Sequence, residues 1–302
     1  MKTMDNFDSL YSRYLDEFND FLQSRTDIKK FEGRDSDGFY SVMEAITYSL
    51  ANGGKRIRPV IALEFCRLCS GDHTDALDFA LAIEMIHTYS LIHDDLPCMD
   101  DDDLRRGKPS NHIVYGYANA LLAGDGLQAL AFETIARSEL SDDKKTAAIT
   151  LLADAAGPCG MVAGQAMDLD NENKYIGLDD LKATDSLKTG KLITASALMG
   201  CIAGSADREK FLAAETYSKN IGLAFQIVDD ILDVTGDESK LGKPVGSDEI
   251  SGKSTYVTLL GIDEAKRLAK ELTTEAVRAL TVFGDDAWFL EELASKLLYR
   301  ES

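Results

Sequence analysis

The sequence is poor in the residues that interrupt helices. Only 5 of its 302 residues are proline, and no segment shows the alternation of apolar and polar residues that is typical of a strand. Apolar residues instead recur every three or four positions, most clearly from Leu77 to Ile92, which predicts a largely buried helix. All five prolines fall at expected helix starts or in loops, so long helices can run between them. We therefore predict an all-α fold, a bundle of about ten or more helices.

Cysteines and long apolar runs are also scarce. Five cysteines, an odd number in a long chain, do not suggest a disulfide framework and favour a reducing compartment. The single C-x2-C pair, Cys66 and Cys69, lacks a second pair at zinc spacing, so we interpret it as packing. The longest uncharged run, 192–206, is shorter than the roughly 18 residues of a membrane-spanning helix, and charges interrupt the first fifteen residues. The sequence predicts a cytoplasmic protein without a membrane span.

Positive charge is in deficit, because 32 basic residues face 52 acidic ones and the net charge is −20. A general nucleic-acid role needs a basic surface, so that class is excluded. An anionic substrate is not excluded, since screening acts over roughly 8 Å at physiological salt and local cations decide. No linker, repeat or low-complexity tract divides the chain, and we predict one domain over residues 1–302.

Glycine, proline, aspartate and serine cluster in a few segments that we predict to be loops. These segments are 29–37, 100–110, 171–177 and 235–254. The last is about twenty residues long, and loops of this length in compact domains are usually functional. We interpret it as a candidate lid.

Six acids crowd the segment after the predicted helix: Asp94, Asp95 and Asp100 to Asp103. Acidic clusters at helix ends are usually solvated, but here an apolar helix leads directly into Asp94 and Asp95. The carboxylates are therefore expected at the edge of the core, where like charges are costly without a cation. Pro97 should end the helix near Asp95 and let the loop bring Asp100 back towards Asp94. The acid spacing of an EF-hand is absent, which excludes a calcium loop of that kind.

A second acidic set, Asp229, Asp230 and Asp233, ends another apolar run. Asp229 and Asp233 are four residues apart and share one helix face. Two such clusters on facing helices could hold several Mg²⁺ ions, because magnesium prefers hard oxygen ligands and often bridges carboxylates to substrate phosphates. The two motifs together predict a site that binds a diphosphate through Mg²⁺.

Cations that a diphosphate site requires lie close to these motifs. They are Lys55, Arg56 and Arg58 in the segment 53–59, Arg105 and Arg106 after the first acidic motif, Lys188 and Lys191 in KTGK, and Lys243 in the candidate lid. The segment 53–59 begins with two glycines and precedes an apolar helix. A glycine turn, a helix N-terminus and three cations could therefore bind an anion together.

Five motifs in order resemble those of the trans-isoprenyl diphosphate synthases, or polyprenyl synthetases. They are GGKRIRP at 53, DDLPCMDDDDLRRGKP at 94, GQAMDLD at 164, KTGK at 188 and FQIVDDILD at 225. The resemblance, from about Tyr40 to Arg300, implies an isoprenoid synthase-type helical bundle around a central cavity. It also implies a homodimer that uses Mg²⁺, three ions per active site, to condense isopentenyl diphosphate with dimethylallyl or geranyl diphosphate. No nucleic-acid partner is implied.

The resemblance also assigns roles to individual residues. Metal ligation falls to Asp94, Asp100 and Asp229, supported by Asp95, Asp230 and Asp233. Isopentenyl diphosphate is assigned to Gly54, Lys55, Arg58, His87 and Arg106, and the allylic diphosphate to Arg105, Lys188, Thr189, Gln226 and Lys243. Catalysis is assigned to Asp94, Asp100, Asp229, Lys188, Thr189, Gln226 and Lys243.

Product length should depend on what closes the cavity floor below Asp94. Tyr89 lies five residues earlier, roughly 7.5 Å along a helix axis, and with Ser90 is the candidate floor, although a tyrosine in an apolar helix is more often ordinary core. A bulky residue here, and two extra residues between the acids of the first motif, resemble bacterial-type farnesyl diphosphate synthases. We predict farnesyl diphosphate (C15), with a C20 geranylgeranyl diphosphate synthase as the alternative.

Two more distant alternatives are a class I terpene cyclase and a non-catalytic synthase subunit. A cyclase usually carries an Asn and Ser/Thr motif in place of Asp229, Asp230 and Asp233, and lacks the cations at Lys55 and Arg58. A non-catalytic subunit has typically lost one acidic motif. Both motifs are intact here.

Overall fold

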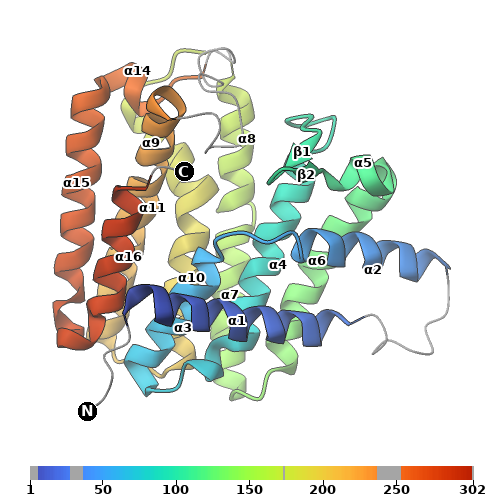
Figure 1. Cartoon of the computed structure of the whole chain (residues 1–302), viewed down its shortest axis with the longest axis horizontal. Helices are drawn as coiled ribbons and strands as arrows, with labels where there is room; N and C mark the ends of the chain where they lie inside the picture. Colours follow the sequence, from blue (N-terminus) through green and yellow to red (C-terminus); the bar gives the residue numbers. More distant parts are fainter. Residues whose placement is uncertain (1–5, 28–36, 173, 237–252, 301–302) are drawn as a thin grey trace.

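The computed structural model describes residues 6–27, 37–172, 174–236 and 253–300, and their arrangement confirms the predicted all-α bundle (Figure 1). The α-helices are α1 (Phe7–Thr26), α2 (Asp37–Leu50), α3 (Ile57–Ser70), α4 (Leu77–Asp94), α5 (Asn111–Tyr115), α6 (Tyr117–Arg137), α7 (Asp142–Ala156), α8 (Met161–Asn171), α9 (Leu178–Asp185), α10 (Lys191–Ala203), α11 (Arg208–Thr235), α14 (Tyr256–Leu260), α15 (Ile262–Ala279) and α16 (Trp288–Leu298). Short helical turns η2 (His73–Ala76), η3 (Ser186–Gly190) and η4 (Leu280–Ala287) complete the set.

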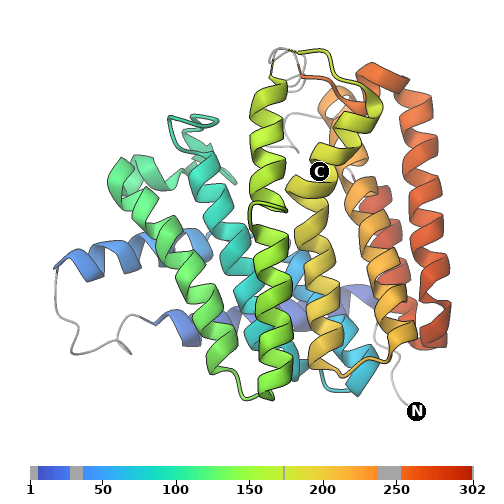
Figure 2. The same cartoon turned by 180° about the vertical axis from the view of Figure 1, so that it is seen from behind.

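Two helices, α4 and α10, form the centre of the bundle. Both are buried on nearly every face, which explains why their sequences are apolar all round. Helix α10 approaches α3 closely at Gly200, where an added Cβ would lie 2.2 Å from the carbonyl oxygen of Ala62. Helices α1 and α2 cross one face of the bundle (Figure 1), and the view from behind shows α7–α8, α10, α11 and α15 side by side (Figure 2).

The C-terminal ends of α4, α8 and α11 lie at one edge of the bundle, the upper edge in Figure 1. Helix α4 ends at Asp94, as the position of Pro97 predicts. The chain then folds back, and the amide of Asp100 donates to the carbonyl oxygen of Asp94 at 2.8 Å. The predicted return of Asp100 towards Asp94 is therefore confirmed.

The predicted loop 100–110 contains a small hairpin that the sequence pattern did not reveal. Strands β1 (Leu104–Arg105) and β2 (Lys108–Pro109) are antiparallel, with Arg105 opposite Lys108. Arg106 and Gly107 form the turn with φ values of 54° and 74°, and a two-residue turn with both φ positive suits the twist of a hairpin. Two residues per strand are too few to produce an alternating pattern.

The other predicted loops have different outcomes. Helix α8 ends at Asn171 and α9 begins at Leu178, so the loop at 171–177 is confirmed for its described residues. Most of the segment 29–37, and residues 237–252 of the candidate lid, lie outside the described residues. The assignment of residues 1–302 to one domain stays a prediction.

One stretch of the described chain, Asp142–Asn171, is long and apolar enough to cross a membrane, with a mean hydropathy of 1.4. It comprises α7 and α8, which a turn at residues 157–160 separates, so it is weak evidence for a span. The uncharged run 192–206, which the sequence singled out, instead contributes most of the buried helix α10.

Candidate active site

Two cavities share a wall made by Arg58 and His87. The aspartate cavity, about 410 Å³, is lined by residues that include Tyr89, Ser90, Asp94, Gln165, Lys188 and Thr189. The arginine cavity, about 470 Å³, is lined by residues that include Gly54, Lys55, Arg106 and Phe225. All five residues predicted to hold isopentenyl diphosphate therefore line one cavity, and that cavity adjoins the one that contains Asp94.

The glycine turn and the hairpin fit together in the arginine cavity. Gly54 has a φ of 120°, and a Cβ there would lie 2.5 Å from Nη1 of Arg106, so only glycine leaves room for this guanidinium. Arg106 Nη1 donates to the carbonyl oxygen of Gly53, and Arg106 itself has a positive φ. This positive φ belongs to the hairpin turn, which directs the Arg106 side chain towards Gly53 and Gly54. The turn at Gly53 and Gly54 thus positions a cation that is about fifty positions away in the sequence.

The three cations of the segment 53–59 do not act alike. Arg56 Nη1 lies 2.5 Å from Glu84 Oε1, and both side chains are almost completely buried. Its charge is therefore already neutralised by Glu84, which contradicts the expectation that all three cations bind an anion together. For Lys55 and Arg58 anion binding stays a prediction. Burial lowers the pKa of Arg58 to about 10, which leaves it charged at neutral pH.

His87 is uncharged in this wall. Burial lowers its pKa well below the usual value, and the charges of Arg58, Arg106, Arg56 and Arg105 lower it further. A neutral imidazole can still donate one hydrogen bond to a ligand in the cavity.

Asp94 is the acid of the aspartate cavity. Burial raises its pKa to about 6; the charge of Lys188 opposes this shift, and that of Asp100 adds to it. The neighbouring Asp95 is buried and accepts hydrogen bonds from Arg105, one of them from Nε at 2.8 Å. The two adjacent acids therefore have different surroundings, because Asp94 faces the cavity and Asp95 pairs with the hairpin arginine.

The Lys188 turn lies against α8. Residues Ser186–Gly190 form a π-helical turn, a widened geometry that is frequent at functional sites. Gly164 allows the contact, since a Cβ there would lie 2.1 Å from the amide nitrogen of Lys188. Lys188 Nζ lies 2.6 Å from Asp168 Oδ2, and Thr189 Oγ1 lies 3.3 Å from Gln226 Oε1 of α11. The turn thus links α8 to the second acidic motif.

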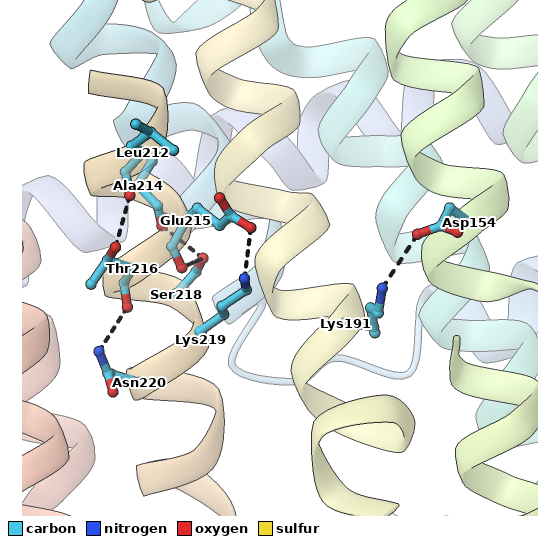
Figure 3. A network of polar contacts seen from close by, with 9 residues as sticks. All are labelled: Asp154, Lys191, Leu212, Ala214, Glu215, Thr216, Ser218, Lys219 and Asn220. Carbon is cyan, nitrogen blue, oxygen red and sulfur yellow. Dashed lines mark hydrogen bonds and ion pairs between the residues drawn. The ribbon is translucent and has the colours of Figure 1, made fainter. Parts of the chain in front are cut away.

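Lys191 of the same KTGK motif lies elsewhere. Its Nζ is 3.3 Å from Asp154 Oδ2 of α7, and the Glu215–Lys219 pair of α11 lies on the other side of α10 in the view of Figure 3. These residues line a separate cavity of about 380 Å³, so Lys191 does not lie with the other described cations of the predicted diphosphate site. The two lysines of the motif are therefore divided between two cavities.

The second acidic motif also divides its members. Asp229 Oδ1 lies 2.7 Å from Nη2 of Arg300. Asp230 is buried, and its Oδ2 accepts a hydrogen bond from the amide of Tyr256 at 2.8 Å, which attaches the start of α14 to α11. Asp233 is buried as well.

Residues with the chemistry for magnesium are present, although within the described ranges no three His, Cys, Asp or Glu side chains converge closely enough to hold a metal by themselves. Carboxylates are the hard ligands that Mg²⁺ takes, and this ion completes its shell with waters and substrate phosphates. Two buried donors, Gln165 Nε2 and Arg58 Nε, have no hydrogen-bond partner among the described residues, and both belong to residues that line the aspartate cavity. Unpaired donors in the wall of a cavity suit an anionic ligand, because they lack an acceptor. The residues thus fit Mg²⁺ bound together with a diphosphate.

Sequence reasoning assigned no role to four further residues. Asp168 of GQAMDLD accepts from Lys188 and from Lys253, the latter at 3.4 Å. Burial acts to raise the pKa of Asp168, but the two lysines outweigh it and the net shift is downward. Asp185 is half-buried, and the charges of Asp168 and Lys188 act on its carboxyl group. The signal for Asp168 was the motif itself, whereas Lys253, Asp185 and Arg300 carry no local signal. Lys243, predicted to contact the allylic diphosphate, lies outside the described residues.

Known proteins resemble the chain over most of its length. The family model for polyprenyl synthetase matches residues 40–281. Farnesyl diphosphate synthase of Geobacillus stearothermophilus is 49% identical over 76% of this chain and 78% of its own length. Geranylgeranyl pyrophosphate synthase 3 of Arabidopsis thaliana is 47% identical over 80% of this chain and 69% of its own length. A geranyltransferase of Helicobacter pylori, solved with magnesium and isoprenyl diphosphate, superposes with a TM-score of 0.81 at 35% identity and covers 99% of this chain and 98% of its own. This chain belongs to the polyprenyl synthetase family of prenyltransferases.

Proposed function

We propose that the chain condenses isopentenyl diphosphate with dimethylallyl and then geranyl diphosphate, and so produces farnesyl diphosphate with Mg²⁺ as cofactor. The observation that carries this proposal is the pair of adjoining cavities with a common wall. One cavity offers cations to an anionic substrate, and the other offers the half-buried carboxylate of Asp94 beside an apolar lining. A reaction that joins two diphosphates requires two such sites next to each other.

The arginine cavity holds isopentenyl diphosphate in this proposal. Lys55, Arg58 and Arg106 supply positive charge, and the neutral His87 donates a hydrogen bond without adding to the repulsion among the arginines. Because Arg58 and His87 also line the aspartate cavity, they can orient the isopentenyl group towards the second substrate.

The allylic diphosphate binds in the aspartate cavity, where Lys188 and Thr189 contact its oxygens. Asp94, Asp100 and Asp229 would hold the Mg²⁺ ions, three in number by family resemblance. When bound, these ions withdraw charge from the diphosphate and make it a better leaving group. Lys188 adds a fixed positive charge where negative charge develops.

Bond changes then follow from this placement. The allylic C–O bond breaks, and both its electrons leave with the diphosphate. The double bond of isopentenyl diphosphate donates its electron pair to the allylic cation and forms the new C–C bond. A proton leaves the resulting cation, and the released diphosphate accepts it. Apolar lining residues such as Met99, Met161 and Leu169 exclude water from the cation.

Product length is set at Tyr89 in this proposal. Tyr89 is 6% exposed, lines the aspartate cavity and packs edge-on against His93 with ring centroids 5.7 Å apart. Burial raises its pKa to about 12, and the nearby Asp94 adds to this, which places the phenol within electrostatic reach of that carboxylate. The adjacent Ser90 lines the same cavity.

Labelled isopentenyl and dimethylallyl diphosphates with Mg²⁺ test this function. We expect a C15 product from the purified chain and longer products from Tyr89→Ala. A predominant C20 product would make the chain a geranylgeranyl diphosphate synthase, and no product at all would exclude synthase activity of the chain by itself. Unchanged C15 output from Tyr89→Ala would remove Tyr89 from the cavity floor.

We also propose a homodimer. Large apolar side chains are exposed on α5 and the first half of α6: Ile113, Val114, Tyr117, Leu121 and Leu122. Contiguous exposed apolar patches commonly mark protein interfaces. Sedimentation analysis should find a dimer, and Leu122→Asp should shift it to the monomer. A monomeric wild-type chain at micromolar concentration would exclude the dimer.

A cytoplasmic location is part of the proposal. All five cysteines are unpaired, and Cys98 and Cys159 are exposed, which suits a reducing compartment. Fractionation of the expressing cell with a tagged chain tests this location.

A further inference from the structure

Arg300 lies two residues beyond the end of α16 and reaches the second acidic motif on α11. Its Nη2 is 2.7 Å from Asp229 Oδ1 and donates to the carbonyl oxygen of Phe225 at 2.9 Å. Its guanidinium carbon lies 3.8 Å from the centre of the Phe225 ring. The side chain of Arg300 is only 9% exposed, whereas that of Asp229 is 43% exposed. Three separate contacts thus hold this arginine on one turn of α11.

The pair also adjoins the arginine cavity. Phe225 lines that cavity, and Lys55 is close enough for Arg300 and Asp229 to act on its charge in opposite directions. Arg300 therefore lies between the carboxylate of the second motif and the cations that face a diphosphate. Figure 1 shows why this is possible, because α16 runs beside α11 and brings the end of the chain to the upper half of that helix.

The carboxylate of Asp229 cannot bind the Arg300 guanidinium and a metal ion at full strength at the same time. A hydrogen bond from Arg300 occupies lone pairs of the carboxylate, and a divalent ion at the same oxygens would repel the arginine charge. A diphosphate changes this balance, since its oxygens offer the guanidinium another acceptor with more negative charge.

We propose that Arg300, through its ion pair with Asp229, weakens metal binding at the second motif until a diphosphate binds and accepts the hydrogen bonds of the arginine. We call this ion pair the Arg300 latch. Metal and diphosphate then bind together, and the metal alone binds poorly. This inference rests on the proposed function, because it takes Asp229 as a metal ligand. Arg300 acts through Asp229, so its role is that of a positioning residue.

Binding of Mn²⁺ in equilibrium dialysis tests the latch, with the excess of metal on the protein side over the protein-free side as the readout and inorganic pyrophosphate, present on both sides, as the diphosphate probe. Without pyrophosphate, we expect Arg300→Gln to bind Mn²⁺ about fivefold more tightly than the wild type, the size of one partly exposed ion pair. With saturating pyrophosphate, the difference should largely disappear. Equal affinities of Arg300→Gln and wild type without pyrophosphate would overturn the latch.

Lys296→Gln is the matched control. Lys296 lies four residues earlier, on α16, and its ammonium pairs with Asp8 at 3.3 Å, so the substitution removes the same charge from the same region without touching Asp229. Lys296→Gln should bind Mn²⁺ as the wild type does. If it gained as much Mn²⁺ affinity as Arg300→Gln, the effect would be due to net charge and the latch would be overturned.

Asp229→Asn added to Arg300→Gln should abolish the gain, and a gain that persists would place the effect elsewhere and refute the inference. If Arg300→Gln does not fold, Arg300→Lys tests the same point, because it keeps the charge but loses the second donor and the planar stacking on Phe225. A gain in Mn²⁺ affinity by Arg300→Lys, smaller than the one expected for Arg300→Gln, supports the latch. The absence of any gain contradicts it. A wild-type chain that binds no Mn²⁺ even with pyrophosphate would refute the proposed function itself, which separates the two failures.

Discussion

The two aspartate motifs are alike in sequence but differ in their surroundings. In the first motif, Asp94 ends α4 and faces a cavity, whereas Asp95 pairs with Arg105. In the second, Asp229 lies within α11 and pairs with Arg300, whereas Asp230 accepts a hydrogen bond from the start of α14. In each motif the first aspartate is the predicted metal ligand, whereas the second attaches a neighbouring segment of the chain.

The largest effect should come from removing the first aspartate of each motif. We expect Asp94→Asn and Asp229→Asn each to lower kcat/KM by about 10²–10³-fold, because both act on charge in the transition state. If both hold the same ions, the double variant should lose less than the product of the two losses. Asp154→Asn, on the opposite side of the Lys188 turn, is the control. Steady-state kinetics measure these losses. If kcat/KM of either single variant stayed within about twofold of the wild-type value, the two motifs would not be functionally equivalent.

The charge of Lys188 acts on Asp94, and its neighbour Thr189 contacts Gln226 of the second motif, so Lys188 provides the next test. Lys188→Ala should lower kcat by about 10²-fold, since its charge faces the developing diphosphate. Lys191→Ala, three residues away, should change kcat by less than about twofold, because Lys191 pairs with Asp154 outside the aspartate cavity. Equal losses of kcat in the two variants would show that catalysis depends on the integrity of the turn and not on the direction in which the Lys188 side chain points.

The attaching role of the second aspartate predicts a loss of stability. Asp230→Ala removes the acceptor of the buried Tyr256 amide and should lower the free energy of unfolding by about 1–3 kcal/mol. Urea denaturation measures this change. Asp154→Ala, at an exposed ion pair, should cost less than about 1 kcal/mol. Should Asp230→Ala be as stable as wild type, the division of tasks between adjacent aspartates would not hold.

The smallest effect concerns pH and the carboxyl group of Asp185 near the second motif. Burial raises its pKa to about 7; Tyr256 and Lys188 oppose this shift, and Asp168 and Asp229 add to it. The folded state therefore retains a proton that the unfolded chain has already lost above about pH 4. The stabilising contribution of this proton is complete below pH 4 and is lost as the pH rises through about 7.

Asp185→Asn should remove that dependence. In the metal-free protein, the variant should gain about 1–2 kcal/mol relative to wild type between pH 5 and pH 8. Thermal unfolding at the two pH values measures the difference. A difference that does not change with pH would mean that Asp185 is ionised in the folded protein throughout this range.

Much of the fold and half of the site could be predicted because they depend on neighbours in the sequence. Helical periodicity identified α4, and Pro97 located its end, since both act over a few residues. The five motifs contain several of the residues that line the two cavities, among them Arg58, Asp94 and Lys188. The hairpin of β1 and β2 was missed because its two-residue strands are shorter than any periodic pattern.

Partners that come from distant segments were not predictable. Arg56 turns to Glu84, and Arg300 reaches Asp229 across 71 positions, because helix packing and not local preference brings them together. The directions of Lys188 and Lys191 depend on a π-helical turn that packs against Gly164, which no local pattern reveals.

The sequence by itself determined the all-helical class, the place where α4 ends and the family to which the motifs point, since periodicity and proline act locally. Only the tertiary structure decided which carboxylates face a cavity and which are held by other side chains. The physical reason is that burial and ion pairing, which set the state of each charge, arise when helices far apart in the chain pack together.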